Sequence, residues 1–526
     1  MLPNSLKTVL LRSTILVGAT AFALPAVAAV AVAAPAGTAV TEAADAGEKE
    51  ITVTGSLIKN PNLVRATPVI VTTSEEIELR QSNTAEEVLR EIPGVVPSIG
   101  SAINNGNGGA SYVNLRGLGE QRNLVLLDGN RIVPAGLSGI VDLNNIPLAL
   151  VDRVETLTGA ASTTYGADAI SGVVNFITKK NFTGVDISGS EQITEKGDGN
   201  YYRTDATIGG NFADDKGNAV FSVGYQHADP VYQGDRAFSY YNIYSFDGTD
   251  NGPNSGSSNA VPAQFTGTRP IDPVTGLPST DPAVKNNGRR QLIPATGLVG
   301  PTYAPFNFNP YNLFQTPFKR FNIFGQAHYE ASEHFDFYTR GMFSKNTVNT
   351  ILAPGAAFAI VSTVPLSNPY LPAALRNQFC AFNTAAAGSG LYTPRFTPAE
   401  CTAAAAVTSP SDPAYRTVTT EIRRRTTELG VRLSEYTTTL FDYKAGVRGK
   451  ITSHLDYDLY GAYGESTNQS SVTGNVLKSR FLQSLLATNT TTCLTNTNGC
   501  VPLNVFGPAG SITAAQGAFL TAAATL

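Results

Sequence analysis

The sequence predicts a membrane β-barrel that follows a small α+β domain, and three observations carry this prediction. From residue 182 onward apolar and polar residues alternate, as they do over 320–330. Very short connections between the predicted strands alternate with very long ones. The chain also holds 49 Gly and 9% aromatic residues but only 15% charged residues. This composition fits strands in which only every second residue must be apolar.

The composition excludes some classes of protein and leaves others open. The net charge of −4 provides no basic surface for nucleic acid. The charged fraction of 15% lies below the roughly one quarter that is usual in soluble domains. A β-rich secreted protein would have a similar composition, so composition alone favours the barrel only slightly.

Residues 1–34 predict a secretory signal peptide. Lys7 and Arg12 precede an uncharged, Ala-rich stretch over 14–36, which Pro25 interrupts and which contains small-residue cleavage patterns. A membrane-spanning helix is the alternative, because this stretch is long enough to cross about 30 Å of hydrocarbon. The proline and the acidic segment that follows favour the signal peptide. No later stretch has the pattern of a spanning helix, so residence in a membrane would require a closed barrel.

The four cysteines form two local pairs in the sequence, Cys380 with Cys401 and Cys493 with Cys500. The chain has four His, and none lies near a cysteine, so the spacing predicts no metal site. Export would place the cysteines in an oxidising compartment, and we therefore expect two small loop disulfides. Free thiols are the alternative. We expect neither a metal nor a cofactor.

Residues 35–64 predict a linker that contains one short extended segment. The segment 50–56 alternates β-branched residues, and no neighbouring stretch would pair with it as a hairpin. An isolated strand beside a linker suits β-augmentation, in which it adds to a sheet of another protein. An ordinary first strand of the next domain is the alternative. The residues that would pair in this way are Glu50, Ile51, Thr52, Val53, Thr54 and Gly55.

Residues 65–180 predict one compact α+β domain. Ser74 begins a first helix, and Thr84 caps a second one, where Glu87 completes a capping-box pattern. Asp128-Gly129 is a strong hairpin signal. The predicted strands are 69–72, 112–115, 123–127, 151–157 and 172–178, with a further helical turn that begins at 146–147.

Residues 181–526 predict part of a β-barrel with long extracellular loops. Short connections at 213–218, 331–334 and 451–454 fall on one side of the strands if 423–434 belongs to an outer loop. Long connections, near 229–316 and 348–438, fall on the other side. Outer-membrane barrels show this asymmetry, whereas a β-sandwich, the alternative, does not explain it. The predicted strands lie near 183–190, 201–212, 219–228, 318–330, 335–346, 440–450 and 455–466.

These strands are too few to close a barrel around a domain of this size. Barrels with a plugged lumen need about 22 strands, and an open sheet edge is not stable in lipid. The chain ends at Leu526 without a terminal alternating strand or a terminal aromatic residue. We therefore expect the sequence to be a fragment of a longer protein or a truncated reading frame.

Several segments resemble TonB-dependent outer-membrane receptors, and their order and spacing over 50–180 make the resemblance specific. Residues 50–56 look like a TonB box, the segment through which these receptors pair with the protein TonB. The resemblance covers most of the chain, and the family has a 22-stranded barrel that continues for many strands beyond residue 526. The segments similar to the plug domain are 86–95, 114–119, 126–131, 154–162 and 165–179, and 306–312 is similar to the family's barrel.

The resemblance implies a receptor in the cell outer membrane that imports a scarce ligand into the periplasm. Ligand would bind the outer loops of the plug and barrel, and the box would then pair with TonB. The inner-membrane proton gradient, transmitted through TonB, would displace or remodel the plug. The expected partners are TonB with its energising complex, outer-membrane lipid and a ligand that is a siderophore, vitamin, metal complex, glycan or peptide.

The resemblance also implies two sets of site residues besides the box. The apex loops of the plug would be 103–111 and 134–142, where polar residues are candidates to bind ligand but are more often turn formers. Three charged residues are candidates for ion pairs between plug and wall, with solvated or internally paired charges as an equal alternative. The apex candidates are Asn104, Asn105, Asn107 and Ser111, and the charged candidates are Arg116, Arg153 and Glu155.

Other functions fit the sequence less well. The Gly-rich run 106–109 is not a phosphate loop, because neither Lys-Ser/Thr nor a helix follows it, and no enzyme is predicted. A signal-transducing receptor of this family would carry an extra domain before the box, for which the sequence leaves no room. An adhesin or a passive porin would not explain the plug-like region. A non-functional truncated receptor remains an alternative.

Overall fold

The computed structural model describes residues 69–525 except 81, 99, 101–107, 160, 243–255, 301–303 and 522–523. The predicted signal peptide, linker and box-like segment 50–56 therefore lie outside the described residues. The described residues all belong to one compact unit, Val53–Leu526. They form three regions, which we name the plug region, the wall sheet and the loop domain.

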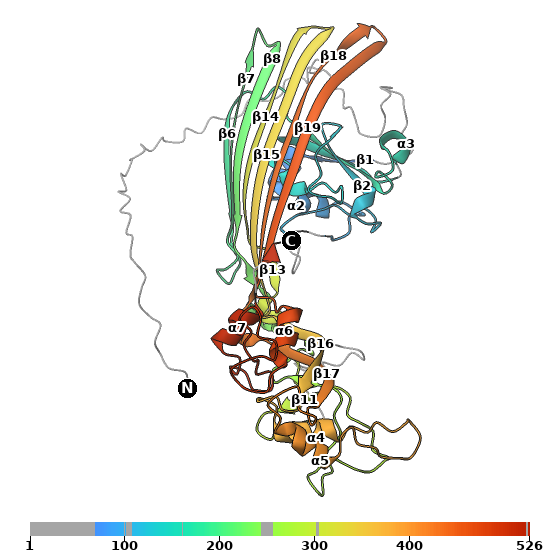
Figure 1. Ribbon diagram of the computed structural model, residues 1–526. Helices are drawn as coiled ribbons and strands as arrows, with labels where there is room; N and C mark the ends of the chain where they lie inside the picture. Colours follow the sequence, from blue (N-terminus) through green and yellow to red (C-terminus); the bar gives the residue numbers. More distant parts are fainter. Residues whose placement is uncertain are drawn as a thin grey trace, which may run out of the picture. The chain divides into compact units, whose positions relative to one another are not determined.

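The plug region, residues 69–180, is a five-stranded sheet with short helices (Figure 1). Its strand order is β1-β4-β5-β2-β3, in which β2 and β5 are parallel and the other neighbours are antiparallel. The strands are β1 Val69–Thr73, β2 Asn123–Leu127, β3 Asn130–Arg131, β4 Val151–Leu157 and β5 Gly172–Thr178. The helices are α1 Ser74–Leu79, α2 Ala85–Arg90 and α3 Ser162–Tyr165, with 3-10 turns η1 Glu120–Arg122, η2 Leu143–Asn145 and η3 Leu148–Leu150.

Local signals explain most of these elements. The hydroxyl of Thr84 accepts from the backbone N–H of Glu87 at 3.3 Å, as the predicted N-cap requires. The second half of the predicted capping box is wrong, because the Glu87 carboxylate accepts from Asn83 N–H, at 2.6 Å. The predicted hairpin is confirmed, since Asp128 and Gly129 both have positive φ, at 51° and 74°, as a type I′ turn needs.

The predicted strand at 112–115 is wrong. In this segment only Leu115 makes a β-bridge, with Val95. Backbone hydrogen bonds join Val96 N–H to Asn114 O at 2.9 Å and Arg116 N–H to Gly94 O at 2.6 Å. The segment is extended because it pairs with the turn that follows α2, and this turn is too short to make a ladder.

The wall sheet is antiparallel and has the strand order β20-β19-β18-β15-β14-β8-β7-β6. The long strands β6, β7, β8, β14, β15, β18 and β19 lie side by side in Figure 1. All seven predicted long strands are present, and β15, β18 and β19 are longer than predicted. The connections between β7 and β8, β14 and β15, and β18 and β19 are the three predicted short ones. The bounds are β6 Gly184–Gln192, β7 Tyr201–Phe212, β8 Gly217–Ala228, β14 Phe318–Ser332, β15 Phe335–Leu352, β18 Arg432–Thr452, β19 Leu455–Thr473 and β20 Ala524–Thr525.

The predicted outer-loop segment 423–434 divides between two sheets. Its first residues belong to β17 (Thr417–Arg425) of the loop domain, whereas Arg432 already pairs with Leu352 in the wall sheet. The prediction is therefore wrong for the last residues of the segment. The ladder between β15 and β18 continues beyond the apolar part of the strands, where alternation of polar and apolar residues no longer marks it.

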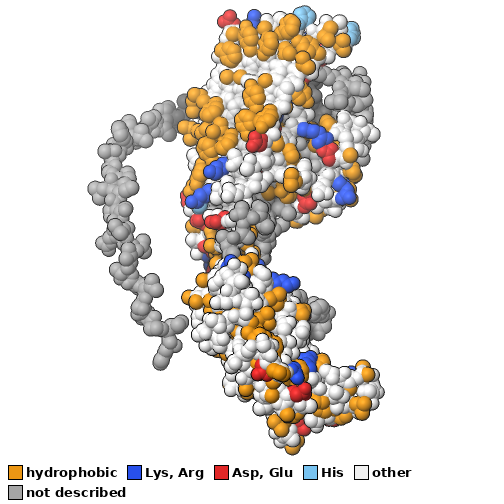
Figure 2. All heavy atoms as spheres, in the orientation of Figure 1, with side chains coloured by type: hydrophobic (Ala, Val, Ile, Leu, Met, Phe, Trp, Pro, Cys, Tyr) orange, Lys and Arg blue, Asp and Glu red, His pale blue; other side chains and the backbone are white. Residues whose placement is uncertain are grey.

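The wall sheet has two faces of different character. On β14, Phe321 and Tyr329 are exposed, whereas Phe324 is buried. Figure 2 shows hydrophobic side chains gathered on the visible face over these strands. The other face packs against the plug region. This arrangement confirms the predicted two-residue period, which places alternate side chains on opposite faces.

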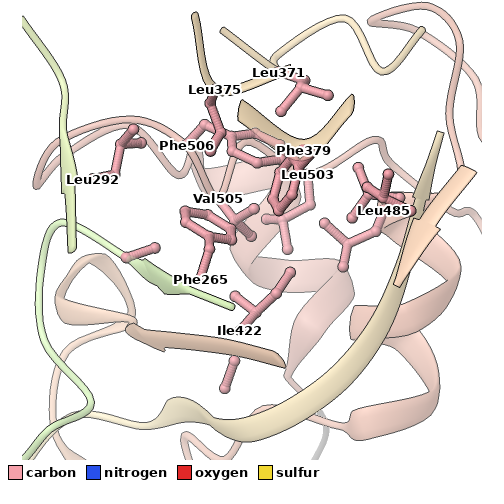
Figure 3. Close-up of a cluster of buried hydrophobic side chains, with 14 of the residues drawn as sticks. Phe265, Leu292, Leu371, Leu375, Phe379, Ile422, Leu485, Leu503, Val505 and Phe506 are labelled. Atoms are coloured by element: carbon pink, nitrogen blue, oxygen red, sulfur yellow. The ribbon is translucent and has the colours of Figure 1, made fainter. Parts of the chain in front are cut away.

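The loop domain combines three long connections that are far apart in the sequence. Its five-stranded sheet has the order β12-β11-β10-β17-β16. Its core contains Phe265 from the first connection, Phe379 from the second and Phe506 from the third, and these rings lie near one another in Figure 3. The elements are β10 Gln264–Phe265, β11 Arg290–Ile293, β12 Leu298–Val299, β16 Ala356–Pro365, β17, α4 Ala373–Cys380, α5 Pro398–Ala405, α6 Lys478–Leu485 and α7 Ala514–Leu520.

A small antiparallel pair, β9 Val231–Tyr232 with β13 Leu313–Gln315, lies at the start and end of the first long connection. Short 3-10 turns at Gln233–Asp235, Ala237–Ser239, Asn309–Tyr311 and Thr427–Leu429 complete the described elements. Among the described residues, no helix has both the length and the apolar character needed to cross a membrane.

Candidate functional site

The candidate functional site is the contact between the plug region and the inward face of the wall sheet. Four apolar wall residues join the core of the plug region: Val220, Phe324, Met342 and Leu440, each at most 4% exposed. Burial of such side chains stabilises a contact by about 1.5–3 kcal/mol each. The plug region and the wall therefore share one core.

A buried ion pair on the wall contacts the backbone of the plug hairpin β2–β3. Arg340 on β15 donates from Nη2 to Asp442 on β18 at 3.1 Å, and both side chains are less than a tenth exposed. Arg340 Nη1 also donates to Leu127 O at 3.1 Å. Asp442 accepts from the backbone N–H of Val133 at 3.1 Å. Each charge thus has a partner on the plug as well as on the wall.

Neighbouring wall residues extend this contact along the exit of the hairpin. Lys444 Nζ donates to Asn130 Oδ1 at 2.6 Å. On β19, Ser466 Oγ and Asn468 Nδ2 both donate to Ala135 O, at 2.8 Å and 2.5 Å. Three strands of the wall therefore bind the plug segment between Leu127 and Ala135.

A second contact lies where the last plug strand leads into the wall. Gln326 on β14 donates to Lys179 O at 2.9 Å and accepts from Thr178 Oγ1 at 3.1 Å. The Asp128 carboxylate of the hairpin accepts from Thr178 N–H at 2.9 Å. The hairpin turn, β5 and β14 are thereby linked by one chain of hydrogen bonds.

A third contact involves the turn before α2. Asn83 Oδ1 accepts from Ser190 Oγ on β6 at 2.7 Å, and Asn83 Nδ2 donates to Gln192 at 3.4 Å. Arg203 on β7 donates to Asn83 O at 3.4 Å and forms an ion pair with Asp205. The first wall strands therefore contact the N-terminal helices of the plug region.

Most of the predicted binding residues lie outside the described residues. This holds for the TonB-binding candidates, Glu50 to Gly55, and for the ligand candidates Asn104, Asn105 and Asn107. Ser111 is described and is 1% exposed. Its N–H donates to Asp142 at 2.9 Å and its hydroxyl donates to Glu86 at 2.9 Å. The Ser111 side chain is therefore already used inside the plug region.

The carboxyl group of Asp142 is the electrostatic centre of this buried network. It accepts from Asn144 N–H at 3.0 Å, and Asn144 Nδ2 donates in turn to Gly109 O at 2.9 Å. Burial raises the pKa of Asp142 above its usual range, and the positive charge of Arg320 on β14 opposes this increase. The network ties the end of the apex segment to η2.

The three charged candidates for plug–wall ion pairs have partners within the plug region. Arg116 donates to Thr158 O at 2.6 Å. Arg153 pairs with Glu155 at 2.9 Å and with Asp152 at 2.9 Å. In the plug–wall hydrogen bonds described above, the charged side chains lie on the wall strands. Their signal in the sequence is a charged residue at an inward-facing position of an alternating strand, as at Arg340, Asp442 and Lys444.

The cysteines pair locally in the loop domain. The structure has disulfides between Cys380 and Cys401 and between Cys493 and Cys500. In the part of the chain that the structure describes, no group of three or more His, Cys, Asp or Glu side chains is arranged to hold a metal ion.

Comparison with known proteins assigns the N-terminal region. Residues 64–173 match the family model of the TonB-dependent receptor plug domain. A mutant of the ferric enterobactin receptor from Pseudomonas aeruginosa, solved with enterobactin, is 16% identical with a TM-score of 0.37, covering 78% of this chain and 50% of that one. The siderophore receptor PirA from Acinetobacter baumannii is 16% identical with a TM-score of 0.35, covering 81% and 50%. The unliganded ferric citrate transporter is 13% identical with a TM-score of 0.33, covering 78% and 48%.

This chain spans about half the length of each of these solved structures. The family model covers β1 to β4 completely and ends at residue 173, the second residue of β5. The match lies in the plug region defined above and includes the capped helix α2 and the Asp128-Gly129 hairpin. The chain therefore carries the plug domain of the TonB-dependent receptors.

Proposed function

We propose that this chain forms the plug and the first wall strands of a TonB-dependent receptor in the outer membrane. The receptor imports a scarce ligand, such as a siderophore, vitamin, glycan or peptide, with energy from the inner-membrane proton gradient. The observation that carries the proposal is a plug-family domain packed on the inward face of a sheet whose outward face is apolar. A sheet with lipid on one side and a plug on the other needs this combination.

The dimensions of the apolar face support residence in a membrane. On β14 the outward apolar residues run from Phe321 to Tyr329, a stretch of roughly 27 Å at the rise of an antiparallel strand. The apolar band of outer-membrane barrels is about 25 Å tall. Aromatic residues lie at both ends of the stretch, because Tyr329 pairs with Phe337 and Phe321 pairs with Tyr225. The short connections then belong to the periplasmic side and the loop domain to the outside.

The box-like segment supplies the proposed link to TonB. Glu50 to Gly55 precede β1, the first strand of the plug sheet, so a strand paired there would act directly on the plug. Asn104, Asn105 and Asn107 are the proposed polar contacts of the ligand at the apex.

The experiment combines cell fractionation with cross-linking to TonB. The Thr54→Cys variant should form a disulfide with a cysteine placed in the TonB partner strand, whereas Ala44→Cys in the linker should not. Adding Val53→Pro should abolish the cross-link, since proline removes a backbone donor from the strand. A protein found outside the outer-membrane fraction, or an equal cross-link at residue 44, would overturn the proposal.

A further inference from the structure

Among the described residues, the largest group of hydrogen bonds between the plug and the wall lies at the β2–β3 hairpin and the segment that follows it. We propose that Arg340, Asp442 and Lys444, which we name the wall triad, hold the plug in the lumen by binding this hairpin and so set how readily the plug is displaced. This inference rests on the proposed function, because the wall triad would position the plug, which is the part of that receptor that moves.

The triad binds mainly backbone atoms of the plug. Arg340 donates to Leu127 O and Asp442 accepts from Val133 N–H, both at 3.1 Å. The two side chains also bind each other, so neither charge depends on the plug alone for a partner. Charge-assisted hydrogen bonds are stronger than neutral ones, and burial from water strengthens them further. A backbone contact of this kind tolerates changes in the plug's side chains but requires the hairpin to lie in one position.

Lys444 is held in place by the wall before it meets the plug. Its ammonium lies 3.7 Å from the ring centroid of Tyr460 and 5.2 Å from that of Tyr338. Asn130, which accepts from Lys444, also donates to Asp128 O at 2.8 Å and so lies within the hairpin turn itself. A preorganised cation therefore meets the tip of the hairpin.

The wall is also shaped to allow this contact. A Cβ atom added at Gly464 on β19 would lie 2.7 Å from Val133 Cβ, closer than side-chain atoms approach each other. Glycine at this position lets Val133 reach Asp442, and Ser466 and Asn468 bind the next turn of the chain at Ala135. Steric fit and charge thus converge on the same plug segment.

The position of the hairpin in the plug sheet determines which movement of the plug the wall triad would resist. The strand order β1-β4-β5-β2-β3 places the hairpin at one edge and β1 at the other. The proposed TonB-binding segment precedes β1 in the sequence. Within the sheet, a force applied there crosses the other strands before it reaches the wall triad at the far edge, so the triad resists displacement of the whole sheet.

A charge swap distinguishes two roles of Arg340 and Asp442, namely binding the plug hairpin and stabilising the wall between β15 and β18. The double variant R340D/D442R keeps an ion pair between β15 and β18. It removes both backbone contacts, because an aspartate at 340 cannot donate to Leu127 O and an arginine at 442 cannot accept from Val133 N–H. Under the proposal the swap loosens the plug at least as much as Arg340→Gln, which leaves the contact between Asp442 and Val133 N–H in place. If the pair only stabilised the wall, the swap would behave like the parent protein.

The chain offers a matched control on the same two strands. Arg448 on β18 and Asp336 on β15 form an ion pair at 2.7 Å. This pair has the same donor and acceptor types as Arg340 and Asp442. The hydrogen bonds described for it join only wall residues. The control variant R448Q/D336N should therefore leave the seating of the plug unchanged.

The test measures entry of vancomycin, which intact outer membranes exclude, into cells that carry the intact receptor and lack TonB. Loss of two hydrogen bonds to charged groups should raise entry roughly tenfold or more in the swap, and loss of the single bond to Leu127 O in Arg340→Gln should raise it less. Gly464→Val, which pushes Val133 away, should act in the same direction. Heat-modified migration in electrophoresis confirms that each wall is folded.

Equal entry for the swap, Arg340→Gln and the parent protein would overturn the proposal, as would an equal increase in the control. Because the cells lack TonB, this result is independent of energised transport. Failure of the Thr54→Cys cross-link would count against the proposed function without deciding whether the triad seats the plug.

Discussion

The plug region and the loop domain each have a buried core, but the two cores are completed in different ways. The plug core includes Val220, Phe324, Met342 and Leu440 from the wall sheet. Among the described residues, the loop-domain core contains no residue of the seven long strands. The plug therefore depends on the wall for part of its core, whereas the loop domain is complete in itself.

The plug region and the loop domain also differ in how their segments are cross-linked. Both disulfides lie in the loop domain, and residues 65–180 contain no cysteine. The loop domain also contains the buried Arg269, which donates to Ser279 O at 3.0 Å and to Val284 O at 2.6 Å. Under the proposed function, reversible polar contacts suit a plug that is displaced during transport, and covalent cross-links suit a loop domain that keeps a fixed shape.

The largest expected effect tests the shared core of the plug and wall. Phe324→Ala should reduce the free energy of unfolding by about 3–5 kcal/mol, because it leaves a cavity between β14 and the plug. Hydrogen exchange should increase in the plug strands and not in the loop domain. Phe321→Ala on the outward face of the same strand is the control and should leave exchange in the plug unchanged.

A cavity in the loop-domain core is the reciprocal experiment. Phe379 is fully buried in α4, and Phe379→Ala should cost the loop domain about 3–5 kcal/mol. Faster hydrogen exchange should be confined to the three long connections. Faster exchange in β2, β4 or β5 would show that the two cores are coupled and would break the comparison.

Removal of the disulfides should have smaller and unequal effects. The pairs are separated by 21 and 7 residues. The chain-entropy estimate gives roughly 3 kcal/mol for Cys380–Cys401 and roughly 2 kcal/mol for Cys493–Cys500. Thermal unfolding of the Cys→Ser double variants, followed by exchange in the loop domain, should reproduce this order. Unchanged protection in both variants would mean that the buried side chains alone hold the domain.

The N-cap of α2 tests how much local structure contributes to the plug. Thr84→Ala should cost about 1 kcal/mol, since it leaves the N–H of Glu87 without its capping hydroxyl. Thr84→Ser keeps the hydroxyl and should restore most of the loss. A denaturation curve for each variant measures the difference, and equal midpoints for Ala and Ser would contradict the assigned cap.

The smallest effect concerns the buried Asp142. Its pKa is raised in the folded plug, so the neutral form favours folding. This contribution is fully present below the ordinary pKa of an aspartate and is lost as pH rises through the raised pKa. The parent plug should therefore lose stability relative to Asp142→Asn as pH rises above the ordinary pKa of an aspartate. Parallel pH profiles for the two proteins would exclude this role.

Much of the fold could be predicted because it depends on neighbours in the sequence. The type I′ turn at Asp128-Gly129, the Thr84 cap and the long wall strands all follow from local conformation or from a two-residue period. The strand predicted at 112–115 failed because its β-bridge partner, the turn at Val95, is set by tertiary packing. The loop domain was not predicted, because none of its three connections has a complete core of its own.

The sequence by itself determined where the long strands lie along the chain, their two faces and the local pairing of the cysteines. Only the tertiary structure decided which charged wall residues meet the plug. Arg340 and Leu127 lie 213 residues apart, and Asp442 and Val133 lie 309 apart. Alternation shows that such residues point inward, but it carries no information about the backbone atoms opposite them. Those partners depend on the register and curvature of the whole sheet around the plug.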